Sequence, residues 1–86
     1  MKALELRSIV ATNIRATARR RRIALSSLAD FAVVSRSMMF RVLKGESSAT
    51  TDWLASVAEA LKVEPWELLK RPPDTKAEPP AARRRG

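Results

Sequence analysis

Apolar residues recur at helical spacing along most of this 86-residue chain, and the first such stretch is the longest. Leu6, Val10 and Ile14 are each four residues apart. Ile9 lies beside them, so these positions form one apolar stripe. Such spacing is typical of a helix that buries one face. The pattern therefore predicts a helix over about residues 4–20.

Two shorter helices with a tight connection are predicted next, over about residues 25–32 and 35–44. Ser35 is a favourable N-cap, because its side-chain oxygen can accept a backbone N–H of the first turn. Gly45 is expected to end the second helix in the left-handed conformation. The second helix is two-sided, with Met39, Val42 and Leu43 on one side and Arg36, Ser37 and Arg41 on the other.

Two further helices are predicted before the composition changes. Thr50 or Thr51 can cap the fourth, and Pro65 is well placed to open a short fifth helix over residues 65–70. The fourth helix has apolar residues at helical spacing, namely Leu54, Val57, Ala58 and Leu61.

The end of the chain differs in composition from the rest. Residues 72–86 contain four of the five prolines and no large apolar residue. A segment of this kind cannot form a core, and we expect a disordered tail. The sequence thus predicts an all-α protein with one compact five-helix domain over residues 1–71.

Basic residues dominate the N-terminal half of the chain. The formal net charge is +8, and residues 1–45 hold ten basic residues against two acidic ones. Residues 46–71 hold three basic residues against five acidic ones. This asymmetry indicates a side that faces a polyanion, and the alternative is that the charge only confers solubility. The chain has no cysteine and no histidine, which excludes disulfides and the usual zinc sites.

These elements together resemble the lambda-repressor-like, Cro/cI-type (XRE) helix-turn-helix family. The resemblance covers about residues 6–69, and it is carried by the order and spacing of several short pieces rather than by any one of them. It implies a five-helix DNA-binding domain whose helix-turn-helix is formed by residues 25–32 and 35–44. The pieces are Ile14, Ile23, Leu28-Ala29, Val34 to Ser37, Val42, Gly45, the run LASVAEALKV from Leu54 to Val63, and PWELL from Pro65 to Leu69.

Three departures from the family pattern affect the frame of the motif. Ala24 and Leu25 stand where the family usually has a Ser or Thr cap followed by Gln, so the usual phosphate anchor is absent. Val33 occupies the position of the usual turn glycine. Either the turn geometry differs, or Val33 is strained by about 1–2 kcal/mol. Ala18 and Leu43 replace a buried Arg–Glu pair, and a hydrophobic contact there can be neutral or stabilising.

The resemblance places the start of residues 35–44 in the major groove of DNA. Arg36, Ser37 and Arg41, with Phe40 beside them, are then the candidates for contacts to bases. An arginine can donate two hydrogen bonds to guanine, worth roughly 1–3 kcal/mol of discrimination. Met38 can meet a thymine methyl group or pack inside the domain.

Contacts to the DNA backbone are expected around the same helix, where they position the protein without specifying sequence. Arg21 and Arg22 belong to a run of four arginines. These arginines either contact phosphate or are simply exposed to solvent at a helix end. Thr12, Asn13 and Arg15 are further candidates for a surface against the duplex. The full set of expected backbone contacts is Ser35, Lys44, Ser47, Ser48, Arg21 and Arg22.

One recognition helix is too small for high sequence specificity. The resemblance implies a homodimer that binds a pseudo-palindromic site. Trp66, Leu69 and Trp53 are the candidates for the dimer interface, with the core as the alternative place for both tryptophans. We expect a transcriptional regulator of a mobile element, phage, restriction–modification or toxin–antitoxin locus. The alternative is a protein-interaction module such as an antitoxin or antiactivator.

Several other classes of function are not expected. The acidic residues are scattered and no glycine-rich phosphate loop is present, so we expect neither an enzyme nor a cofactor or metal. No apolar run approaches a membrane span of about 20 residues, and no signal-peptide pattern is present. We therefore expect a cytoplasmic protein, bacterial or phage-encoded, that associates with the nucleoid and not with a membrane.

Overall fold

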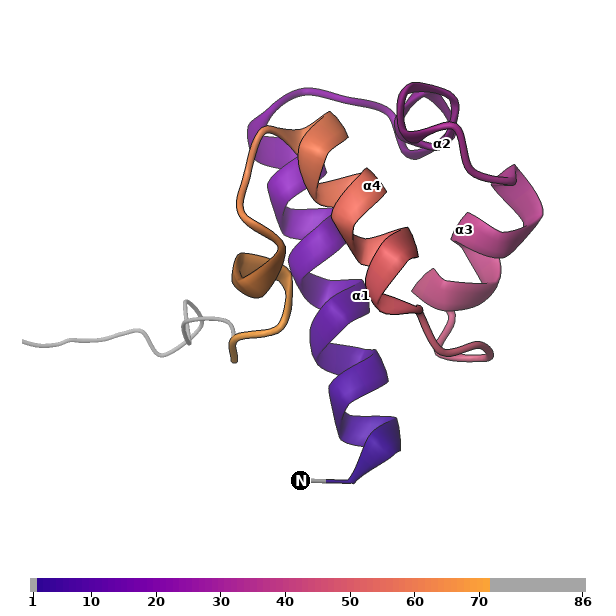
Figure 1. Cartoon of the computed structure of the whole chain (residues 1–86), viewed down its shortest axis with the longest axis vertical. Helices are drawn as coiled ribbons and strands as arrows, with labels where there is room; N and C mark the ends of the chain where they lie inside the picture. The colour runs from indigo at the N-terminus through magenta and orange to yellow at the C-terminus, as the bar shows by residue number, and fades with distance from the viewer. Residues whose placement is uncertain (1, 72–86) are drawn as a thin grey trace, which may run out of the picture.

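The computed structural model describes residues 2–71 as four α-helices followed by a short 3-10 helix (Figure 1). The elements are α1 (Ala3–Arg20), α2 (Leu25–Ala32), α3 (Arg36–Leu43), α4 (Thr51–Leu61) and the 3-10 helix η1 (Pro65–Leu68). α1 contacts α2, α3 and η1, and α4 contacts α2 and η1. Figure 1 shows α2 and α3 on one flank of α1 and α4, and η1 on the other flank. The predicted all-α class is confirmed for these residues, and the predicted tail lies outside them.

The predicted fifth helix is shorter than expected. Pro65 does open it, but η1 is a four-residue 3-10 helix, so the described residues contain four α-helices rather than five. The chain turns toward α1 directly after η1. The side-chain amide of Asn13 donates to the carbonyl of Leu68 at 2.9 Å and to that of Lys70 at 2.7 Å. These carbonyls are therefore satisfied by α1 and not by a longer helix.

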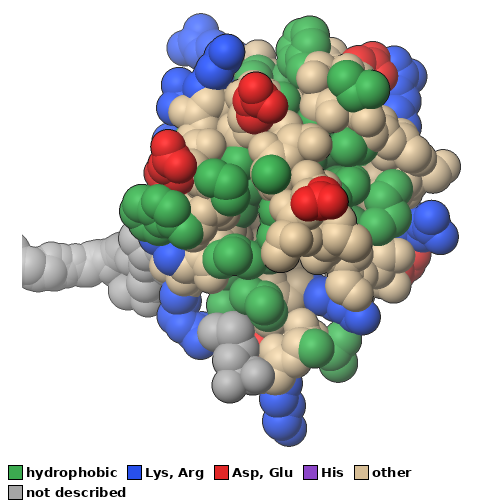
Figure 2. Space-filling view, viewed as in Figure 1, with side chains coloured by type: hydrophobic (Ala, Val, Ile, Leu, Met, Phe, Trp, Pro, Cys, Tyr) green, Lys and Arg blue, Asp and Glu red, His purple; other side chains and the backbone are tan. Residues whose placement is uncertain are grey.

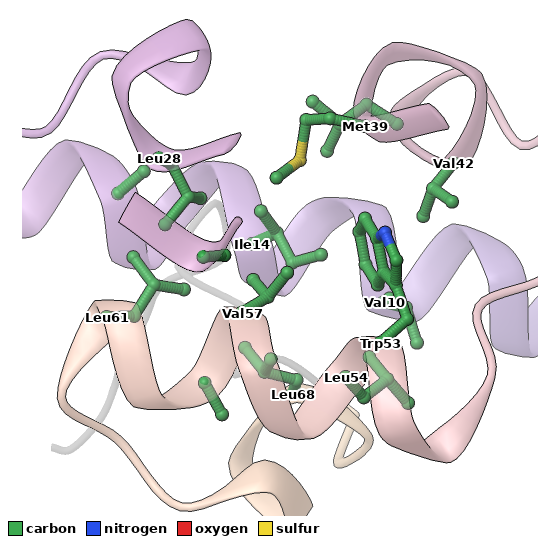
Figure 3. Packing of buried hydrophobic residues seen from close by; sticks show 14 of the residues in the cluster. Val10, Ile14, Leu28, Met39, Val42, Trp53, Leu54, Val57, Leu61 and Leu68 are labelled. Carbon is green, nitrogen blue, oxygen red and sulfur yellow. The ribbon is translucent and has the colours of Figure 1, made fainter. Parts of the chain in front are cut away.

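One apolar core joins the five elements, each of which contributes a side chain with 1% exposure or less (Figure 3). Leu6 departs from the predicted stripe, because 37% of its side chain is exposed. Leu6 lies one turn before Val10 and lines a surface groove together with Leu54 and Leu69. The fully buried residues, one from each element, include Ile14, Leu28, Met39, Val57 and Leu68.

All four α-helices end in the same way, with a left-handed residue just beyond the helix. These residues are Arg22, Val33, Gly45 and Lys62, with φ values of 58°, 58°, 78° and 63°. The following N–H then donates to the carbonyl five residues earlier, as Val34 does to Ala29 at 2.9 Å. This arrangement satisfies carbonyl groups that a helix end leaves free. Gly45 is confirmed in this role, whereas the other three ends use a residue with a side chain.

Candidate nucleic-acid interface

Helix α3 is fixed at its start by its predicted cap. The Ser35 hydroxyl accepts the backbone N–H of Met38 at 3.1 Å, so Ser35 is confirmed as the N-cap. This bond occupies the side chain that was also expected to meet the DNA backbone. Ser35 remains exposed, and its hydroxyl can still donate to an acceptor.

The two faces of α3 differ as the sequence predicts. Met39, Val42 and Leu43 are buried in the core. Met38 is half-buried and packs against the core, which favours packing over a contact to thymine. The opposite face is exposed and forms a shallow concavity. It is lined by Arg36, Ser37, Phe40, Arg41 and Lys44, which we call the α3 outer face.

The α3 outer face lies on a basic edge of the molecule. Figure 2 shows Lys and Arg side chains around the rim of the view, including the edge along α3. The centre of the same view, over α4, carries apolar and acidic side chains. The structure thus brings together all four residues expected to contact bases, together with Lys44.

Arg36 already has a partner on α2, which sequence reasoning did not find. Its Nε donates to Oδ1 of Asp30 at 3.1 Å, and its Nη2 donates to Oδ2 at 2.7 Å. These hydrogen bonds lower the pKa of the Asp30 carboxyl below its ordinary value and raise that of the Arg36 guanidinium. Both groups are therefore charged at neutral pH. One feature of the sequence could have indicated this ion pair, because Asp30 is the only acidic residue between positions 6 and 45.

The loop between α3 and α4 lies against α1. Ser47 is half-buried and Ser48 is exposed. The Ser48 hydroxyl accepts a hydrogen bond from Nη2 of Arg7 at 3.3 Å. Arg7 thus adds a cation to the loop expected to meet phosphate. Sequence reasoning missed it, because residues 41 positions apart come together only through the fold.

The middle of α1 contributes to the same side of the molecule in part. Thr12 and Arg15 are exposed and share a small concavity with Lys44. Asn13 does not belong with them, since it is 7% exposed and bound to the carbonyls of Leu68 and Lys70. The expectation that Asn13 faces the duplex is therefore wrong, because its amide is used to fix the end of the fold.

The arginines at the end of α1 have separate surroundings. Nη2 of Arg21 donates to the carbonyl of Lys62 at 3.3 Å, so Arg21 serves the C-terminal end of α4. This partner is at the far end of α4 from the loop that holds Ser48. Arg22 is exposed two residues before Ala24, the N-cap of α2. The structure does not group either arginine with the α3 outer face, and phosphate contact by Arg22 stays a prediction.

The structure shows the surroundings of the residues that depart from the family pattern. Leu25 is half-buried and packs against the core, and Ala24 is an N-cap with no side-chain bond. Ala18 and Leu43 are both buried in the core, with 1% and 5% exposure. Val33 adopts the left-handed conformation with φ 58° and is 89% exposed. The turn thus has the geometry that usually takes glycine, and the strained alternative is the one observed.

The two tryptophans lie in different surroundings. Trp53 is 9% exposed and belongs to the core (Figure 3), so its assignment to a dimer surface is corrected. Trp66 is 60% exposed, and the ammonium of Lys70 lies 5.4 Å from the centre of its ring. Leu69 is 39% exposed and lines an apolar groove together with Leu6.

Residues 2–71 offer neither a membrane-spanning helix nor a metal-binding cluster. No helix there is both long and apolar enough to cross a membrane. No cluster of three or more Asp or Glu side chains in that range is arranged to hold a metal ion.

Comparison with known proteins gives similarity in structure but not in sequence. No protein-family model matches the chain, and no curated protein matches it either. A solved HTH_3 family transcriptional regulator from Vibrio cholerae is similar, with a TM-score of 0.73 and 24% identity. The match covers 78% of this chain, which spans only 38% of the length of that protein.

A second solved structure is similar over most of both chains. It is a hypothetical transcription factor, NHTF, from Neisseria, with a TM-score of 0.76 and 22% identity. The match covers 84% of this chain and 83% of that one. The chain therefore shares its fold with these two solved proteins.

Proposed function

We propose that this chain is a sequence-specific DNA-binding transcriptional regulator that inserts α3 into the major groove. The observation that carries the proposal is the α3 outer face, which gathers Arg36, Arg41 and Lys44 around Ser37 and Phe40. The major groove admits one α-helix and distinguishes all four base pairs by their donors and acceptors. The opposite face of α3 is buried, so the orientation of these side chains is fixed by the core.

The residues beyond the C-terminal end of α3 support contacts to phosphate. Lys44, Thr12 and Arg15 share one concavity beside the end of α3. Ser48 and Arg7 form a second polar site in the α3–α4 loop. Such contacts fix register on the duplex, while the base contacts of α3 supply the sequence preference.

We further propose that the regulator acts as a homodimer on a pseudo-palindromic operator. Trp66 and Leu69 are exposed on or beside η1, which lies on the opposite flank from α3 in Figure 1. Pairing of two copies through this surface doubles the contacted DNA and sets two half-sites about one helical turn apart. We propose that the regulator acts in the cytoplasm. Its operator would lie near a mobile-element, phage, restriction–modification or toxin–antitoxin locus.

A second candidate function is a protein-interaction module. It is favoured by exposed apolar residues at the C-terminal end of α2, where Phe31 is 65% exposed and the C-cap Val33 is 89% exposed. They line a groove together with Ile23 and α4. A surface of this kind suits a protein partner, and it does not overlap the α3 outer face.

Selection of bound sequences from random DNA tests the proposal. We expect the full chain to enrich a two-fold symmetric site, with an affinity that falls steeply as salt increases because bound phosphates release counterions. The double variant Arg36→Ala, Arg41→Ala should lose this enrichment while keeping its thermal unfolding transition, since both side chains are exposed. Phe31→Ser is the matched control and should still select the same site. Unchanged selection by the double variant would refute the proposed function.

A further inference from the structure

The pair between Asp30 and Arg36 bridges the two helices of the helix-turn-helix. Asp30 lies in the last turn of α2, and Arg36 is the first residue of α3. Both oxygens of the carboxylate are engaged, at 3.1 Å by Nε and at 2.7 Å by Nη2. The two side chains are 54% and 62% exposed. An exposed pair of this kind contributes little to stability, so stability alone gives no reason for its bidentate geometry.

The pair leaves most of the guanidinium free. An arginine carries five N–H donors in a planar fork. Asp30 takes one from Nε and one from Nη2, which together form one edge of the fork. Both N–H groups of Nη1 and the second one of Nη2 remain. One N–H of Nη1 and the second one of Nη2 are parallel and form another edge. Two parallel donors on that edge match the O6 and N7 acceptors of guanine.

We infer that Asp30 is a positioning residue, which holds the guanidinium of Arg36 in one plane so that its free edge meets a guanine. This inference rests on the proposed DNA-binding function. A free arginine side chain loses much rotamer freedom when it is ordered at an interface. Here that ordering is already made by the carboxylate before DNA arrives. The pair also leaves no unpaired negative charge on Asp30, next to the basic side chains of the α3 outer face.

The test measures discrimination between bases rather than affinity alone. The site enriched by the full chain is resynthesised with every single-base change, and dissociation constants are measured for wild type, Arg36→Ala and Asp30→Ala. Arg36→Ala should lose roughly tenfold or more of the discrimination at one base pair. Asp30→Ala should lose several-fold at that same base pair and leave the other positions unchanged. The variant that combines Asp30→Ala with Arg36→Ala should discriminate no worse than Arg36→Ala alone, because the carboxylate acts only through the arginine.

Two further variants separate positioning from charge and from folding. Glu59→Ala removes an exposed carboxylate from α4, and it should raise affinity for all DNA without changing discrimination. Asp30→Asn keeps the size of the side chain but loses the second acceptor, so it should weaken the same discrimination as Asp30→Ala. If Asp30→Ala loses its cooperative unfolding transition, the result for Asp30→Asn decides whether Asp30 positions Arg36.

The outcomes distinguish the inference from the proposed function. If Arg36→Ala relaxes one base pair and neither Asp30 variant does, Asp30 is not a positioning residue, while the DNA-binding proposal stands. If Asp30→Ala only raises affinity for all sequences, as Glu59→Ala does, the carboxylate acts as a simple charge and the inference fails. If wild type enriches no sequence, both fail together.

Discussion

Val33 is a β-branched residue in a backbone conformation that usually takes glycine. Its φ of 58° lies in the left-handed region, which costs a residue with a side chain roughly 1–2 kcal/mol. Its side chain is 89% exposed, so it recovers almost nothing through packing. The sequence alone left two possibilities for this position, and only the folded turn distinguishes them. The backbone of Val34 shows why the turn persists, since its N–H donates to Ala29 at 2.9 Å.

Replacement of Val33 by glycine should therefore stabilise the domain. Relief of the strain outweighs the entropic cost of glycine, about 0.5–1 kcal/mol, and leaves a net gain of up to about 1.5 kcal/mol. For a domain of this size that corresponds to a rise in Tm of several degrees, measured by circular dichroism. Ala55→Gly is the matched control, because Ala55 is exposed within α4, and it should lower Tm instead. A fall in Tm for Val33→Gly would mean that the turn is not strained.

At the scale of elements, the sequence predicts what depends on local patterns. The approximate bounds of α1 to α3, the cap Ser35 and the end at Gly45 follow from periodicity and capping rules. For α4 the sequence left Thr50 and Thr51 as alternative caps, and the structure shows Thr50 in that role. The α3 outer face follows too, because both faces of one helix are visible in its own residues. What could not be predicted depends on distant contacts, as with Arg7 and Ser48.

The end of the fold shows the same limit, because η1 is held by α1. The amide of Asn13 donates to the carbonyls of Leu68 and Lys70, which lie 55 and 57 residues further along the chain. An asparagine in a basic helix resembles a DNA contact when only its neighbours in sequence are considered. Its burial in the folded chain gives it a structural role instead.

Asn13→Ala should destabilise the domain by roughly 1–3 kcal/mol, because it leaves two carbonyls without their partner. The midpoint of urea unfolding measures this effect. The neighbouring variant Thr12→Ala is the control, since Thr12 is exposed and its removal should change stability by less than about 0.5 kcal/mol. Equal midpoints for the two variants would show that the amide does not fasten η1 to α1.

At the scale of the whole molecule, the fold separates two surfaces of different chemistry. The α3 outer face is basic and lies on one flank (Figure 2). The other flank carries Trp66 and Leu69, and Leu69 continues into the apolar groove beside Leu6. A surface shared by two identical copies is self-complementary about a two-fold axis. In the proposed homodimer, pairing through this flank would leave both α3 helices free for DNA.

Self-association should accordingly depend on Trp66. Trp66→Ser removes a large apolar side chain that is 60% exposed, so it should shift the chain toward monomers in sedimentation equilibrium while the monomer keeps a cooperative unfolding transition. Phe31→Ser is the control, because Phe31 is similarly exposed, at 65%, but lies on α2. It should leave the association constant unchanged. If Phe31→Ser dissociates the dimer and Trp66→Ser does not, the two copies meet through α2 instead, and the flank that carries η1 is free for another partner.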